Sequence, residues 1–165
     1  MNKFLRLGSR LLDPGPVARW PQPGRVLGGL ALLALRLWLG WAFLKTGLHR
    51  LDSWSSQPFL FRSVHPVPLL EAEVAALVTT GAELLLPVAL MLGLLARPAA
   101  LGLAVMAATI YFVVGQTPEG LENGIALAAE QFPWMAAGLL VAALGAGPLS
   151  LDALVRPRLV QRWAH

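Results

Sequence analysis

The sequence contains no cysteine, and this absence removes several kinds of chemistry at once. The chain cannot form a disulfide, carry thiol redox chemistry or ligate an iron–sulfur cluster through thiolates. Charged residues are also scarce, at 13% of 165 residues, whereas 56% are hydrophobic. Soluble domains have about 25% charged residues. The composition therefore predicts a membrane protein that folds as one small domain.

Histidine is nearly as rare, and all three histidines lie outside the long apolar segments: His49, His65 and His165. A haem held between two helices by a pair of histidines is therefore excluded. No ligand spacing accompanies these residues, so no metal site is expected. Glycine-rich phosphate loops and nucleophile elbows are absent as well. The net charge of +4 has no accompanying cluster of aromatic residues in the polar segments, so no nucleic acid partner is expected.

Long apolar segments dominate the sequence. Residues 26–48 and 74–96 are each long enough to span a bilayer, which takes about 20 residues. Two further apolar segments cover residues 98–115 and 125–146. We therefore predict an all-α fold, an integral membrane four-helix bundle with a lipid bilayer as its surroundings. Its predicted parts are a cytoplasmic or interfacial segment 1–25, the bundle at 26–147 and a cytoplasmic basic tail 148–165.

The basic residues of the connections predict the orientation of the bundle. Nine lie in the N-terminal segment, the second connection and the C-terminal segment, and only two on the alternate side, and basic residues favour the cytoplasmic side. Both termini are therefore predicted to be cytoplasmic, with loops 49–73 and 116–124 facing outward. The nine are Lys3, Arg6, Arg10, Arg19, Arg25, Arg97, Arg156, Arg158 and Arg162; the two are Arg50 and Arg62.

Arg36 and Glu83 each lie near the middle of a long apolar segment. An ionised side chain at the bilayer centre costs at least about 2.5 kcal/mol, so such residues usually face the bundle interior and find a partner. If the two helices are antiparallel neighbours, the two residues differ in depth by only about 5 Å. We therefore predict that Arg36 and Glu83 form a buried charge pair. Such a pair either fixes the helix register or serves a function.

The first long helix has two contrasting faces at 100° per residue. Arg36, Gly40, Phe43 and Gly47 share one stripe, and small residues on it favour close helix packing. The opposite stripe has two readings. Lys45 can extend to the interface beside interfacial tryptophans, or the stripe can bind a ligand or a partner. The candidate ligand or partner residues are Trp38, Trp41, Lys45 and His49, together with Tyr111 and Gln116 near the outward end of the third segment.

The outer loop 49–73 is too apolar for a free linker, because it contains Trp54, Phe59 and Phe61. It is expected to fold back over the bundle as a lid. Pro87 removes the helical hydrogen bond to the carbonyl of Glu83 and opens the backbone there. If this kink faces outward, a pocket would run from the outer surface to mid-membrane, with Arg36 and Glu83 as its floor.

Three motifs resemble the DoxX family of small four-helix membrane proteins over about residues 30–155: RLWLGWAFLKTGLHRL, GAELLLPVALMLGLLARPAALGLAVMA and GAGPLSLDALV. The resemblance implies a multi-pass protein of the bacterial cytoplasmic (inner) membrane. Lys45 and residues 54–88 look most like the branch that accompanies peptide-modifying iron oxidases and small secreted metal-binding peptides. The matching residues are Arg36, Gly40, Phe43, Gly47, Arg50, Glu83, Arg97, Ala100, Gly145, Gly147, Ser150, Leu151 and Asp152.

The resemblance leaves two candidate functions for the chain. In the first, the chain is a membrane accessory or anchoring subunit of a bacterial oxidoreductase or of a peptide-modification or metal-stress system, and a protein partner carries the redox or modification activity. In the second, it is a subunit like those of thiosulfate:quinone oxidoreductase and binds quinone near Arg36, Glu83 and Tyr111. The first is favoured, because the chain itself has no complete catalytic or redox site. Quinone is a possible ligand, and a homo-oligomer is also possible.

Overall fold

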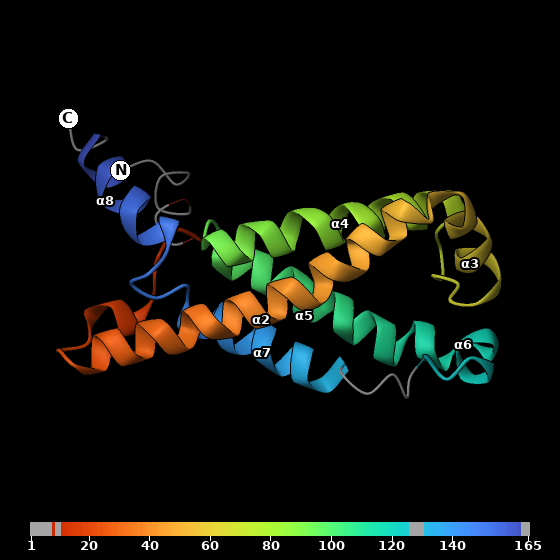
Figure 1. Ribbon diagram of the computed structural model, residues 1–165, viewed down its shortest axis with the longest axis horizontal. Helices are drawn as coiled ribbons and strands as arrows, with labels where there is room; N and C mark the ends of the chain where they lie inside the picture. The colour runs from red at the N-terminus through yellow and green to blue at the C-terminus, as the bar shows by residue number, and fades with distance from the viewer. Residues whose placement is uncertain (1–7, 9–10, 126–130, 163–165) are drawn as a thin grey trace.

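The computed structural model describes residue 8, residues 11–125 and residues 131–162, and the regular secondary structure of this part is helical. No strand occurs in these residues, so the predicted all-α class is confirmed. Figure 1 shows an elongated bundle. Its helices are η1 (Pro16–Arg19), α2 (Gly24–Asp52), η2 (Trp54–Ser56), α3 (Gln57–Ser63), α4 (Ala72–Leu92), α5 (Ala96–Phe112), η3 (Val114–Gln116), α6 (Pro118–Glu122), α7 (Gln131–Leu144) and α8 (Leu151–Arg162).

Three helical segments in the described residues are long and apolar enough to cross a membrane: α2, α4 and the stretch from Ala96 to Gln116. The fourth predicted span, 125–146, corresponds to α7, whose described part has 14 residues. Residues 126–130 of that span lie outside the described residues. The protein is thus a membrane protein, and its fourth span stays a prediction.

The four apolar helices pack as a closed ring, because α2 contacts α4, α4 contacts α5, α5 contacts α7, and α7 contacts α2. Small side chains on α5 make the tightest of these contacts possible. Ala100 and Ala104 are buried, and a Cβ added at Gly138 of α7 would lie 2.8 Å from the Ala100 carbonyl oxygen. The backbones of α5 and α7 therefore approach closely along alanine and glycine, the mode of packing favoured between membrane helices.

The predicted division of the first long helix into two faces is confirmed. Arg36, Leu39 and Phe43 are at most 2% exposed and face the other helices. Trp38 and Trp41 are 48% and 59% exposed, and Lys45 and His49 are exposed on the same outward side. The helix therefore turns its polar and aromatic stripe away from the bundle interior.

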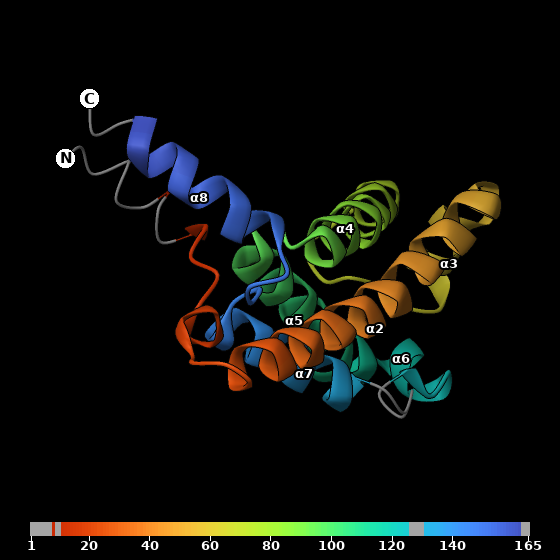
Figure 2. The same ribbon diagram turned by 60° about the vertical axis from the view of Figure 1, so that its left-hand side comes forward.

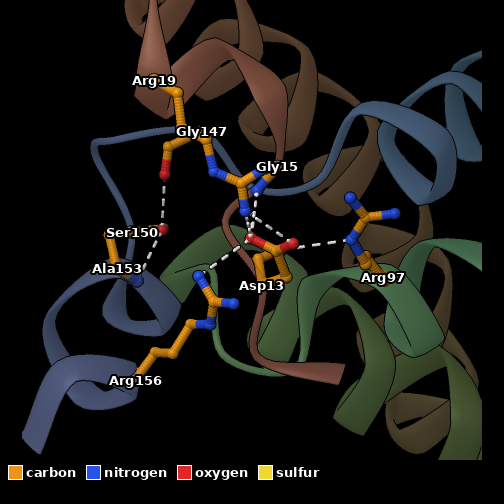
Figure 3. A network of polar contacts seen from close by, with 8 residues as sticks. All are labelled: Asp13, Gly15, Arg19, Arg97, Gly147, Ser150, Ala153 and Arg156. Atoms are coloured by element: carbon orange, nitrogen blue, oxygen red, sulfur yellow. Dashed lines mark hydrogen bonds and ion pairs between the residues drawn. The ribbon is translucent and has the colours of Figure 1, made fainter. Parts of the chain in front are cut away.

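The two ends of the described chain meet at one end of the bundle (Figure 3). The Asp13 carboxylate lies 2.9 Å from Arg19 and 3.3 Å from Arg156 of α8, and Gly147 N–H donates to the Pro14 carbonyl at 2.8 Å. Gly147 has φ of 79°, a left-handed conformation that favours glycine. The segment predicted as a basic tail is therefore largely the helix α8, fastened to the bundle at its start. Of the N-terminal segment 1–25, residues 1–7 and 9–10 lie outside the described residues.

The segment predicted as the outer loop is folded at the opposite end, where Figures 1 and 2 show α3 and α6. Of the predicted loop 49–73, the first four residues continue α2 to Asp52, and η2 and α3 follow at once. Phe61 is 3% exposed against Ala75 and Ala76 of α4, so this part of the segment covers the bundle as expected. Phe59 is 65% exposed, so the lid does not bury every aromatic residue that the sequence offers.

Because α8 and the Asp13 contacts share one end and α3 and α6 the other, labelling can test the predicted sidedness. The chain has no cysteine, so single cysteines can be introduced at exposed positions. Cysteines at Ser55 and Glu122 should react with a membrane-impermeant maleimide in intact cells, and cysteines at Gln22 and Pro157 only after permeabilisation. The reverse pattern would overturn the cytoplasmic placement of the termini.

Candidate functional site

The predicted pairing of Arg36 with Glu83 is wrong, although both side chains are buried, at 0% and 1% exposure. Arg36 Nη1 donates to the Leu90 carbonyl at 3.4 Å, and Nη2 donates to the Leu149 carbonyl at 2.5 Å. Arg36 thus ties the end of α4 to the chain before α8, at the end of the bundle where Asp13 lies. Glu83 lies elsewhere and has another partner.

The error comes from the register between α2 and α4. The prediction aligned the ends of two apolar segments, but α2 continues four residues beyond its segment, to Asp52. A Cβ added at Gly47 would lie 3.0 Å from Glu83 Cβ, so Gly47 is the residue that faces Glu83. Arg36 lies eleven residues earlier, about 16 Å along the helix. Close packing at the glycines therefore sets a register that places Arg36 beyond the reach of Glu83.

The partner of Glu83 is Arg50, which the sequence analysis assigned to the outer side of the membrane. Arg50 lies in the last turn of α2, and its Nε is 2.9 Å from Glu83 Oε2. The side chains are 16% and 2% exposed, so the ion pair is largely shielded from solvent. Glu83 Oε2 nevertheless has no aligned hydrogen-bond donor, and Arg50 Nη1 has no acceptor. The pair therefore keeps unused hydrogen-bonding capacity on both of its members.

A pocket of about 420 Å³ lies beside this pair, between the four packed helices and the lid. Its size falls in the range of small-molecule sites, about 300–1,000 Å³, and its walls are mainly apolar, as in such sites. Among the apolar residues that line it are Phe43, Val78, Val105, Met106, Ile110 and Val114.

Five side chains that line the pocket carry a buried polar atom without a hydrogen-bond partner. Buried polar groups in folded proteins are nearly always paired, so each such atom calls for an explanation. A concentration of them around one cavity indicates a place where a bound molecule supplies the partners. The atoms are Arg50 Nη1, His65 Nε2, Glu83 Oε2, Gln131 Oε1 and Trp134 Nε1.

The lid contributes Phe61 and His65 to this pocket. The Arg50 guanidinium lies 4.9 Å from the centre of the Phe61 ring, a cation–π contact. His65 packs edge-on against the same Phe61 ring, with 4.6 Å between the ring centres. Burial, followed by the positive charge of Arg50, lowers the pKa of His65 to about 4. His65 is therefore uncharged at neutral pH, and the pocket contains one positive and one negative group that offset each other.

A pocket therefore lies beside Glu83, as predicted, but with a different lining. Glu83 lines it and the lid residue Phe61 covers it, but Arg36 is not its floor. Tyr111 packs against Phe112 and Phe132, with ring centres 4.9 and 4.6 Å apart, and its carbonyl accepts a hydrogen bond from Gln116. The remaining predicted residues lie outside the lining: Trp38, Trp41, Lys45, His49, Tyr111 and Gln116.

The sequence does contain a signal for one pocket residue, Arg50. Arg50 follows Gly47 by three residues and continues the inward stripe of Arg36, Gly40, Phe43 and Gly47 at helical spacing. It was counted with the outer loop because the apolar segment ended at residue 48. Gln131 and Trp134 lie one turn apart on α7 and carried no comparable signal.

The structure defines a small helical membrane protein. At one end it has a pocket whose walls are mainly apolar and which contains a few polar side chains. Residues 31–116 match the model of the DoxX family. The chain is also 30% identical over 135 residues to an uncharacterized protein of Haemophilus influenzae, covering 78% of this chain and 85% of that relative. No solved structure matches the chain. The chain belongs to the DoxX family.

Proposed function

We propose that the protein is a membrane subunit that binds a lipid-soluble ligand of the quinone class in the pocket around Glu83 and Arg50. The observation that carries this proposal is the cluster of unpaired buried polar atoms around a largely apolar cavity. Such a cavity suits a molecule with a polar head and an apolar body. Quinones of the bacterial cytoplasmic membrane have this shape and reach the site through the bilayer.

The charges of the pocket support a neutral head group. Arg50 and Glu83 offset each other at 2.9 Å, and His65 is uncharged. A ligand with a net charge would leave the low-dielectric pocket with an uncompensated charge, which is costly. A neutral ring with oxygen substituents meets no such penalty and can still exchange hydrogen bonds with the unpaired atoms.

The proposed subunit serves a protein partner that carries the redox or modification centre. The outward stripe of α2 supports a docking role. Its two tryptophans, Trp38 and Trp41, are about half exposed. Lys45 and His49 extend the same face toward the outer end. Tryptophan is enriched among the anchoring residues of protein interfaces.

Purification of the protein from its own membrane in mild detergent tests the proposal. The wild-type protein should retain quinone in near-stoichiometric amount, measured by solvent extraction and mass spectrometry. Arg50→Met combined with Glu83→Leu removes both charges together, which leaves no stranded ion and preserves the fold. This double variant should retain at least about tenfold less quinone, because the ligand loses hydrogen bonds to charged groups.

The matched control is Arg62→Met combined with Glu73→Leu. This second ion pair also lies at the outer end, but its side chains are 69% and 61% exposed. The control should retain quinone as the wild type does. Equal quinone in all three preparations, or none above the lipid background in the wild type, would refute the proposed function. The same preparations report any copurifying protein with its own redox centre.

A further inference from the structure

The unpaired atoms of the pocket form two donor–acceptor sets on different helices. One set is Arg50 Nη1, a donor, beside Glu83 Oε2, an acceptor, contributed by α2 and α4. The other is Trp134 Nε1, a donor, and Gln131 Oε1, an acceptor, one turn apart on α7. In the ring of helices α4 and α7 are not neighbours, so the two acceptors, Glu83 and Gln131, lie on different walls of the pocket.

We infer that the pocket selects the reduced, hydroquinone form of its ligand over the oxidised quinone, because only the reduced form can satisfy the acceptors on both walls. This inference rests on the proposed function, since it concerns the same site. It specifies which redox state the subunit holds most tightly.

The chemistry of the two forms differs at the oxygens. A quinone carries carbonyl oxygens, which accept hydrogen bonds and donate none. It can pair with Arg50 Nη1 and Trp134 Nε1 but gives no hydrogen to Gln131 Oε1, which has no donor, or to Glu83 Oε2, whose contact with Arg50 Nε at 2.9 Å is an ion pair without an aligned hydrogen bond. A hydroquinone carries hydroxyl groups, each of which donates one hydrogen bond and accepts others. One hydroxyl can therefore accept from Arg50 while it donates to Glu83.

The burial of the acceptors makes the difference in affinity between the hydroquinone and the quinone large. Glu83 is 1% exposed and Gln131 is 6% exposed, so water cannot easily replace a missing donor. A carbonyl oxygen placed against the Glu83 carboxylate adds repulsion between the two acceptors. A buried acceptor left without a donor reduces affinity substantially, and this loss at Gln131 together with the repulsion at Glu83 corresponds to about 10- to 100-fold weaker binding of the quinone.

Binding of a short-tailed benzoquinol and of its oxidised quinone to the full-length protein in lipid nanodiscs tests the inference. Quenching of protein tryptophan fluorescence under anaerobic conditions gives both dissociation constants. The quinol should bind at least about tenfold more tightly, and the midpoint potential of the bound couple should then be at least about 30 mV higher than that of the free couple. Gln131→Met removes one acceptor without a change of charge. In this variant the ratio of the quinone dissociation constant to the quinol dissociation constant should fall several-fold.

The outcomes separate the inference from the proposed function. Binding of neither form would refute both. Equal binding of the two forms, or tighter binding of the quinone, would refute the inference and leave the quinone site standing. A quinol preference that is unchanged in Gln131→Met and in Glu83→Gln would also refute it, because the preference would then arise elsewhere. Displacement of the quinol by diacylglycerol at equal concentration would show a general site for hydroxylated lipids, against the inference. Glu122→Gln is the control, because Glu122 is an exposed acid at the same end of the bundle as the pocket. This variant should keep the wild-type ratio of the two dissociation constants.

Discussion

Arg50→Met should destabilise the folded protein by about 3–5 kcal/mol, the cost of breaking a buried ion pair. The change leaves Glu83, which is 1% exposed, without the guanidinium 2.9 Å from its Oε2. The same change combined with Glu83→Leu should recover most of this loss, because no charge then remains buried without a partner. Unfolding of the purified protein in mixed detergent micelles, followed by circular dichroism, measures the three free energies.

The control for this prediction is Arg62→Met. Arg62 also pairs with a glutamate at the same end of the bundle, at 3.1 Å from Glu73, but the pair is exposed. Exposed pairs contribute about 0–1 kcal/mol, so this variant should remain close to the wild type. If Arg50→Met and Arg62→Met had equal effects, Glu83 would not depend on Arg50.

Arg36→Met is expected to reduce stability by a similar amount, about 3–5 kcal/mol, at the opposite end of the bundle. Arg36 is fully buried and donates to the carbonyls of Leu90 and Leu149. Methionine fills the space but donates nothing, so the Leu149 carbonyl loses the hydrogen bond from Arg36 and the Leu90 carbonyl keeps only the one from Gly93 N–H. The buried carboxylate of Asp152 also loses its nearby positive charge. The variant should unfold more easily in the same detergent assay.

Arg25→Met is the control for Arg36→Met. Arg25 lies in the first turn of the same helix and is exposed. An exposed substitution away from special contacts usually changes stability by less than about 0.5 kcal/mol. A loss of less than about 1 kcal/mol in Arg36→Met would contradict the structural role given to its two hydrogen bonds.

The end of the bundle near Arg36 explains several residues that carried the family resemblance. Asp152 accepts hydrogen bonds from the Leu95 and Ala96 N–H groups at 2.8 and 3.0 Å, and so caps the start of α5 from the start of α8. Arg97 donates to the carbonyls of Asp13, Ala142 and Ala143. These side chains fasten helix ends that a short hydrophobic bundle would otherwise leave with unpaired backbone groups.

Contacts at the pocket end of the bundle account for other residues that carried the family resemblance. Gly47 brings α2 against α4 at Glu83, and Arg50 reaches Glu83 one turn later. Most of the matching residues therefore divide between a structural fastening at the end where the termini meet and the proposed ligand pocket at the other end. Lys45, which the sequence analysis placed in a functional stripe, lies on the outward face and belongs to neither group.

The sequence by itself determined the class of the protein and the faces of its first helix. Apolar segments of about 20 residues in a chain poor in charge leave few alternatives to membrane helices, because the backbone must pair its own polar groups in lipid. Helical spacing then placed Arg36, Gly40, Phe43 and Gly47 inward, as the structure has them. These conclusions depend on periodicity along one segment and need no knowledge of its neighbours.

Only the tertiary structure decided which buried charges meet and what the pocket contains. The partner of Glu83 depends on the register between α2 and α4, which close packing at Gly40 and Gly47 sets and which the apolar segment ends do not reveal. A shift of a few residues along a helix changes depth by several ångströms, enough to exchange one arginine for another. The pocket further combines Phe61 of the lid with Gln131 and Trp134 of α7, and such contacts between distant segments exist only once the helices pack.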